Sequence, residues 1–264
     1  MPPMNGADCR APAVSAHRGG GELAPEGTYE AYQGALEAGA EYAEFDVRRT
    51  SDGTLVAFHR AWAGWGRAVA RVSYARLCAL AGHEVPRITD LARLLAGRAV
   101  GHLDLKEAGS AAGAGGQAVE LLGPAGVVVT TGDGAVAAAL KRRFPDVPVG
   151  LTVGGDTAET ARFTIRRLRM PGLSRLHRVL ASGADWAVVH HRQARTGVLA
   201  ECRARGIKTM VWTVNGDQAL ARWLARPDVD VLVTDRPARA IALRDRWGRA
   251  VECGLGSPGP PAPG

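Results

Sequence analysis

The sequence predicts a single-domain TIM-type (β/α)8 barrel. Short apolar segments alternate with helical patterns along most of the chain, an order typical of a parallel sheet with helical crossovers. Eight such units result when the two segments joined by the turn at Ser51, Asp52 and Gly53 are counted as one. The chain has 264 residues, and an eightfold barrel needs roughly 250.

Each predicted strand is a short apolar or β-branched run between turn residues. The strand segments are Ala13–His17, Glu41–Arg48, Thr54–Phe58, Ala99–Lys106, Val127–Thr131, Val147–Val153, Trp186–His190, Lys208–Val214 and Val229–Thr234. Helical spacing of apolar residues predicts helices that include Thr28–Ala38, Ile88–Leu95, Ala135–Phe144, Gly197–Arg205, Gln218–Leu224 and Pro237–Trp247. The barrel is expected over residues 13–248, between a flexible N-terminus (1–12) and a disordered Pro/Gly-rich tail (249–264).

The composition excludes several classes of protein. Hydrophobic residues make up 46% and charged residues 22%, which excludes wholesale disorder. No apolar run approaches the ~20 residues of a membrane span, so no transmembrane segment is predicted. The net charge is +7, but the arginines that produce it are scattered, so we predict no nucleic-acid partner.

The four cysteines, Cys9, Cys78, Cys202 and Cys253, lie far apart and form no CxxC pair. Such spacing indicates free thiols rather than disulfides or a zinc site. The first residues contain no basic region followed by an apolar run, so no signal peptide is visible. We therefore expect a cytoplasmic location.

Two predicted strands place acidic side chains on the inner face of the barrel. In Glu41–Arg48, Ala43 and Phe45 share the apolar outer face, so Glu44 and Asp46 point inward. Two inward carboxylates are costly unless a positive charge lies between them, which favours a hard divalent cation. The alternative is a polar patch or ion pairs with arginines such as Arg18.

The strand Ala99–Lys106 repeats this pattern, because Asp104 and Lys106 alternate with leucines. Asp104 is then a candidate third carboxylate ligand, and Lys106 a candidate contact to a phosphate oxygen. The alternative for Lys106 is an ion pair with one of the carboxylates.

Two histidines, His17 and His59, end predicted strands at the rim where barrel enzymes keep their active sites. Two histidines can supply an acid and a base near neutral pH. The alternative is that they are structural hydrogen-bonding groups.

These residues belong to an ordered set of motifs that resembles the glycerophosphodiester phosphodiesterase family. The matching segments span roughly residues 13–243. They are His17-Arg18-Gly19, Ala24–Thr28, Glu44–Val47, Thr50–Val56 with Phe58-His59, Val85–Thr89, Leu103–Lys106, Val211–Asn215 and Val231–Pro237.

The resemblance implies a TIM-type barrel, in agreement with the strand count, and it implies roles for individual residues. His17 and His59 match the acid–base pair, and Glu44, Asp46 and Asp104 match the ligands of Mg²⁺ or Ca²⁺. Arg18 and Lys106 match phosphate contacts, Glu26 a polar active-site residue, and Trp212 the mouth of the pocket.

The sequence departs from the family pattern at three positions. Gly27 replaces an asparagine, Arg60 replaces an aspartate after the second histidine, and Asp104 stands where glutamate is usual. Trp62 and Trp65, which follow Arg60, either line a wall for the leaving alcohol or pack under a loop.

The function that the resemblance implies is metal-dependent hydrolysis of a glycerophosphodiester, a small-molecule substrate, to an alcohol and glycerol phosphate. A first alternative is a lysophospholipase D-like or headgroup-cyclising enzyme that acts on lipids. A second alternative is a barrel that binds phosphodiesters without turnover.

Overall fold

The computed structural model describes residues 11–64, 66–107, 111–154 and 175–252. The predicted end segments, 1–12 and 249–264, lie for the most part outside these residues, and so do Trp65, Cys9 and Cys253.

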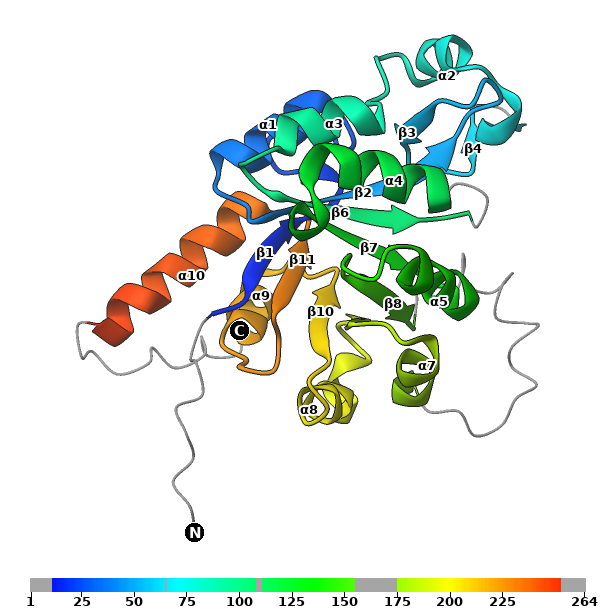
Figure 1. Ribbon diagram of the computed structural model, residues 1–264. Coiled ribbons are helices and arrows are strands. Elements are labelled where there is room, and N and C mark those ends of the chain that lie inside the picture. Colours follow the sequence, from blue (N-terminus) through cyan, green and yellow to red (C-terminus); the bar gives the residue numbers. More distant parts are fainter. Residues whose placement is uncertain (1–10, 65, 108–110, 155–174, 253–264) are drawn as a thin grey trace.

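Eight parallel strands form a closed barrel (Figure 1). The first strand pairs with the last, Ala13 opposite Val231, and also with the second, Ser15 opposite Tyr42, so the sheet has no open edge there. The predicted TIM-type barrel is therefore confirmed. Its strands are β1 (Ala13–Ala16), β2 (Tyr42–Arg49), β6 (Val100–Leu105), β7 (Val127–Thr131), β8 (Val149–Val153), β9 (Trp186–His190), β10 (Lys208–Trp212) and β11 (Val231–Thr234).

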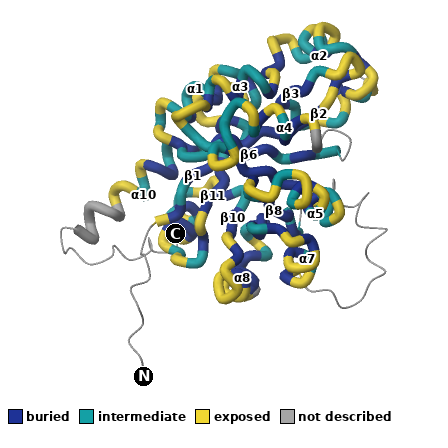
Figure 2. The backbone as a smooth tube through the Cα atoms, viewed as in Figure 1, coloured by how far each residue is buried: buried dark blue, intermediate teal, exposed yellow. Residues whose placement is uncertain are grey.

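Helices surround the barrel and leave its strands as the buried centre (Figure 2). They are α1 (Tyr29–Glu37), α3 (Ile88–Leu95), α4 (Ala111–Leu122), α5 (Gly134–Arg143), α7 (Arg175–Ser182), α8 (Val198–Arg203), α9 (Asp217–Leu224) and α10 (Pro237–Glu252), with short 3-10 turns η1 (His17–Gly19), η4 (Pro124–Gly126) and η5 (Ala194–Thr196). Side chains cap two of the helices in the expected way: Thr28 accepts from the Ala31 amide before α1, and Asp133 from the Ala135 amide before α5.

The alternation of side chains along the strands confirms the predicted facing of β2 and β6. Ala43, Phe45 and Leu103 pack in the apolar layer between the strands and the helices. The interior of the barrel is filled separately, by Val128, Trp186, Val188, Met210, Val231 and Val233. The opposite face of β2 and β6 is therefore free to carry polar groups at one end of the barrel.

An insertion follows β2 and forms a small unit of its own (Figure 1). The predicted segment Thr54–Phe58 forms a hairpin with β2, because β3 (Leu55–Ala57) runs antiparallel to it. The chain continues through β4 (Trp62–Ala63), β5 (Arg67–Ala68), η2 (Val69–Arg71) and α2 (Tyr74–Ala81) before it rejoins the barrel at α3. Six buried side chains hold the unit together: Val56, Ala63, Val69, Val72, Leu77 and Val85.

Candidate active site

Three carboxylates lie together at the carboxyl end of the barrel. The strand register places Asp46 of β2 opposite Asp104 of β6, and Glu44 two residues before Asp46 on the same face. Each offers an oxygen within 4.8 Å of the others, and Glu44 and Asp46 are almost completely buried. The carboxyl ends of the strands are where barrel enzymes carry their chemistry, so this trio marks the candidate site.

The trio holds more negative charge than its neighbours neutralise. Burial, and then the proximity of Asp46, raise the pKa of Glu44 to about 7. Burial acts in the same direction on Asp46, but Lys106, His59 and Arg18 outweigh it and hold the pKa of that carboxyl well below its usual range. A further positive charge would stabilise the ionised form of Glu44.

The donor atoms of the trio fit a hard divalent cation. All are carboxylate oxygens, which Mg²⁺ and Ca²⁺ prefer, and sulfur and imidazole ligands of the kind zinc selects are absent from the trio. Glu44, Asp46 and Asp104 can therefore hold a divalent cation, as the sequence predicted.

Lys106 lies directly against two of these carboxylates. Its Nζ is 2.8 Å from Asp46 Oδ1 and 2.7 Å from Asp104 Oδ2. The hydroxyl of Thr130, at the end of β7, donates to the other oxygen of Asp104 at 3.1 Å. Burial lowers the pKa of Lys106, but Asp104 and Asp46 more than offset this and raise it, so the ammonium stays charged at the site. Both alternatives for Lys106 are compatible with this placement, since it forms ion pairs and lies at the rim.

His17 begins η1, directly after β1, and is held by an acidic partner. Its Nδ1 is 2.6 Å from Asp235 Oδ1, and its Nε2 is 4.0 Å from Glu44 Oε2. Asn215 donates from Nδ2 to the second oxygen of Asp235 at 2.5 Å. Burial lowers the pKa of His17, but the hydrogen bond to Asp235 and the charge of Glu44 outweigh it, and the net effect is a raised pKa. Asp235 and Glu44 thus favour the protonated form of His17.

The ring of His59 lies between a carboxylate and a guanidinium, whereas both partners of His17 are carboxylates. Its Nδ1 is 2.9 Å from Asp46 Oδ2, and its Nε2 is 3.1 Å from an Arg18 terminal nitrogen. A guanidinium only donates, so Nε2 accepts and Nδ1 carries the proton, which Asp46 accepts. The buried Arg48 fixes the His59 backbone by donating twice to its carbonyl, at 3.2 and 3.0 Å.

Arg18 connects the parts of the site through a strained backbone. It is the one non-glycine residue of the described chain with a positive φ, at 53°. That conformation aims its amide at Glu44 (2.9 Å) and its guanidinium at Glu26 (3.0 Å) and Asp46 (3.1 Å). Strain of this kind is typical of functional sites, where surrounding contacts hold it.

The departure at Gly27 has a structural explanation. Gly27 has a φ of 75°, and its amide donates to the Arg18 carbonyl at 2.7 Å. Glycine and asparagine are the residues that adopt this left-handed conformation most easily, so either one can close the Arg18 turn. The other altered position near the histidine, Arg60, is exposed.

The structure brings eight of the nine predicted site residues into one network of contacts: His17, Arg18, Glu26, Glu44, Asp46, His59, Asp104 and Lys106. Trp212 lies at the same end of the barrel, on β10, and packs edge-on against His190 with 5.3 Å between ring centroids. It is half-buried and belongs to a separate aromatic group.

Three polar residues of the site were not predicted: Asp235, Asn215 and Thr130. Asp235 and Asn215 directly or closely follow β11 and β10, and both lie within the segments that carried the family resemblance. Their position after strand ends was therefore an available signal. Thr130 gave no such signal, because nothing in the sequence distinguishes it from its neighbours in a strand of β-branched residues.

A pocket of about 410 Å³ opens beside His17 and Asp235. Its lining is polar and comes from the loops after β1, β10 and β11: Gly21, Glu22, Glu26, Asn215, Asp235 and Arg236. Asp235, which lines the pocket, is hydrogen-bonded to His17, so the pocket is a natural place for part of a substrate.

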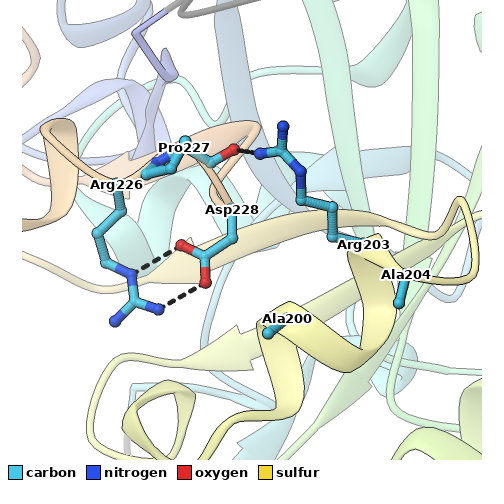
Figure 3. A pocket seen from close by; sticks show the side chains of 6 residues that line it. All are labelled: Ala200, Arg203, Ala204, Arg226, Pro227 and Asp228. Atoms are coloured by element: carbon cyan, nitrogen blue, oxygen red, sulfur yellow. Dashed lines mark hydrogen bonds and ion pairs between the residues drawn. The ribbon is translucent and has the colours of Figure 1, made fainter. Parts of the chain in front are cut away.

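A second pocket, of about 560 Å³, lies at the opposite end of the barrel (Figure 3). It is formed by residues that precede β10 and β11, and Arg226 there is fully engaged by Asp228 at 2.8 and 2.5 Å. None of the predicted site residues contributes to it, so we do not assign it to the chemistry.

Comparison with known proteins identifies the family of the chain. The model of the glycerophosphoryl diester phosphodiesterase family matches residues 17–114 and 106–239, and the chain belongs to this family. A curated relative from Mycobacterium tuberculosis, named "Probable glycerophosphodiester phosphodiesterase 1", is 52% identical over 48 residues, which is 18% of this chain and 18% of the relative. The aligned part thus spans about a fifth of that relative's length.

Solved structures share the fold at low sequence identity. A glycerophosphodiester phosphodiesterase from Agrobacterium tumefaciens has a TM-score of 0.69 at 24% identity and covers 88% of this chain and 99% of its own. One from Thermotoga maritima has a TM-score of 0.70 at 21% identity, with coverage of 89% and 99%. An Oleispira antarctica phosphodiesterase, solved with the product sn-glycerol-3-phosphate, has a TM-score of 0.68 at 19% identity, with coverage of 89% and 97%.

Two other expectations can be compared with the described residues. Cys78 and Cys202 are free thiols, as predicted. Within the same residues, no helix is both long enough and apolar enough to span a bilayer.

Proposed function

We propose that this protein hydrolyses glycerophosphodiesters to an alcohol and glycerol phosphate in a reaction that depends on Mg²⁺ or Ca²⁺. The observation that carries the proposal is the pairing of each histidine with its own carboxylate around one acidic trio. His17 is held by Asp235 and His59 by Asp46, 2.6 and 2.9 Å away. Asp235 and Glu44 favour the protonated form of His17, which suits an acid, whereas Arg18 donates to His59 Nε2, whose lone pair suits a base.

Glu44, Asp46 and Asp104 would hold the cation, which would supply charge neutralisation at a non-bridging phosphate oxygen. Arg18 and Lys106 contact the same carboxylates and add positive charge where the phosphoryl group becomes more negative in the transition state. Glu26 anchors the Arg18 guanidinium, and Trp212 lines the far side of the mouth.

His59 acts as the base in this proposal. Its Nε2 lone pair, now accepting from Arg18, takes the proton of the attacking water as the oxygen bonds to phosphorus. His17 acts as the acid, and it gives its proton to the alkoxide as the bond between phosphorus and the leaving oxygen breaks. Asp235 holds the His17 ring and stabilises its charged form.

Phosphorus NMR of glycerophosphocholine turnover, with Mg²⁺ or Ca²⁺ and with a chelator, tests the proposal. We expect the open monoester, glycerol phosphate, and no product when the cation is removed. A cyclic phosphate would instead show that the substrate's own hydroxyl attacks, as in a headgroup-cyclising enzyme. Binding without any product across divalent cations would support the non-catalytic alternative, and turnover of lysophospholipids alone would support the lysophospholipase D-like one.

A further inference from the structure

The segment from Gly53 to His83 is unusual in its charge. It contains four arginines, and neither acidic residues nor lysine. The four, Arg60, Arg67, Arg71 and Arg76, are all exposed, and within the described chain none forms an ion pair or a side-chain hydrogen bond. Elsewhere Arg226 and many other arginines are neutralised by carboxylates.

Packing explains why these arginines are left outside. Most apolar residues of the insertion, among them Ala63, Val69 and Leu77, pack in its own small core. The hairpin of β4 and β5 is fixed to this core, with the Val69 amide donating to the Ala61 carbonyl at 3.0 Å. The charged side chains therefore cover a rigid unit rather than a loose loop.

A tryptophan is exposed on the same unit. Trp62 has 52% of its surface exposed, whereas its neighbour Ala63 has 2%. It is one of three large hydrophobic side chains exposed in the described chain, with Leu23 and Leu180, and the one that belongs to the segment with the four unpaired arginines. Of the two alternatives for Trp62, packing under a loop does not hold, because the side chain is exposed and the small core is filled by other residues.

The position of this surface relates it to the active site. Arg60 directly follows His59, and the unit projects from the barrel beside β2 (Figure 1). Whatever binds the unit is therefore brought to the edge of the candidate active site.

We propose that this insertion docks on an anionic lipid bilayer through its exposed side chains Arg60, Trp62, Arg67, Arg71 and Arg76. Unpaired guanidinium groups complement anionic headgroups, and each basic side chain near such a surface strengthens binding by about fivefold. Tryptophan is the side chain that lies best at the boundary between headgroups and acyl chains. A nucleic acid would need several stacking side chains along a groove, and the described residues of the unit expose one large aromatic side chain, Trp62. This inference goes beyond the proposed function and does not depend on it.

The test is co-sedimentation of the full chain with phosphatidylcholine vesicles, with and without phosphatidylglycerol, at low and high salt. We expect binding to the anionic vesicles alone, and weaker binding at high salt. The triple variant Arg67→Gln/Arg71→Gln/Arg76→Gln should bind about a hundredfold more weakly, and Trp62→Ala about tenfold. Circular dichroism checks that each variant is folded.

The matched control is Arg142→Gln/Arg222→Gln/Arg246→Gln, which removes the same charge from exposed positions on α5, α9 and α10. It should keep most of the binding. Equal loss in both triple variants would overturn the proposal, because net charge alone would then explain the binding. The absence of binding to anionic vesicles would also overturn it. A third contrary result would be Arg67→Gln/Arg71→Gln/Arg76→Gln or Trp62→Ala losing binding to a labelled oligonucleotide while keeping binding to vesicles.

Discussion

Replacement of Asp235 by asparagine tests the role of the acid most sharply. Asp235 Oδ1 is 2.6 Å from His17 Nδ1, and this carboxylate is one reason why the pKa of His17 is raised. Asn keeps the shape but removes the charge that favours protonated His17. If His17 is the acid, a smaller fraction of the variant enzyme carries the protonated, active form of His17.

The structure sets the size of the expected effect. A hydrogen bond to a charged group contributes roughly 1.5–3 kcal/mol. Because a third of the Asp235 side chain is exposed to solvent, we take the lower half of that range, about 1.5–2 kcal/mol. At about 1.36 kcal/mol per factor of ten, kcat should fall about ten- to thirtyfold.

The assay is steady-state release of glycerol phosphate over a range of pH. An acid works only while protonated, so the rate falls as pH rises through the pKa of His17. Since Asp235 raises that pKa, the fall should occur at lower pH in Asp235→Asn. The control, Asp228→Asn, removes a similarly paired carboxylate at the opposite end of the barrel and should leave the profile unchanged. An unchanged kcat and pH profile in Asp235→Asn would refute the reasoning.

Three further predictions follow from the structure. Asp104→Asn should raise the cation concentration needed for half-maximal activity about tenfold or more, while Asp104→Glu should keep most of the cation affinity. The measurement is activity against cation concentration, and equal behaviour of the two variants would remove Asp104 from the ligand set. Gly27→Ala should lower the free energy of unfolding by about 1–2 kcal/mol in urea, because Gly27 has a left-handed φ, whereas Gly132→Ala, where φ is not positive and a Cβ meets nothing, should be neutral. Burial lowers the pKa of His102 to about 4, so the unfolded chain takes up a proton first as pH falls below about 6.5. The free energy of unfolding should therefore drop by about 3 kcal/mol between that pH and pH 4. A His102→Asn variant with the same drop would contradict this.

Much of the fold could be predicted because side-chain alternation and helix spacing are local properties. Predicted and observed strands agree to within one or two residues, and the observed β1 ends one residue early because His17 turns into η1. Closure of the barrel was inferred from the count of strand–helix units, and the pairing of Ser15 with Tyr42 bears it out.

The acidic trio was predictable from the same alternation, since Glu44, Asp46 and Asp104 occupy inward-facing positions of β2 and β6. The partner of His17 was not, because Asp235 is 218 residues away and only closure of the barrel brings the two together. The role of Gly27 was hidden for a similar reason, because a sequence does not show which glycine has a left-handed φ. The exposure of Trp62 depends on which apolar residues fill the small core, and that is decided by packing.

The central claim is that His17 and His59 perform acid–base catalysis on a phosphodiester. The most direct test is kcat for glycerophosphocholine, with saturating cation, for His17→Asn and His59→Asn beside the exposed-histidine control His83→Asn. General acid–base catalysis contributes about 10²–10⁴, so each active-site variant should lose at least a hundredfold while the control keeps its rate. Wild-type rates in both His17→Asn and His59→Asn would contradict the account.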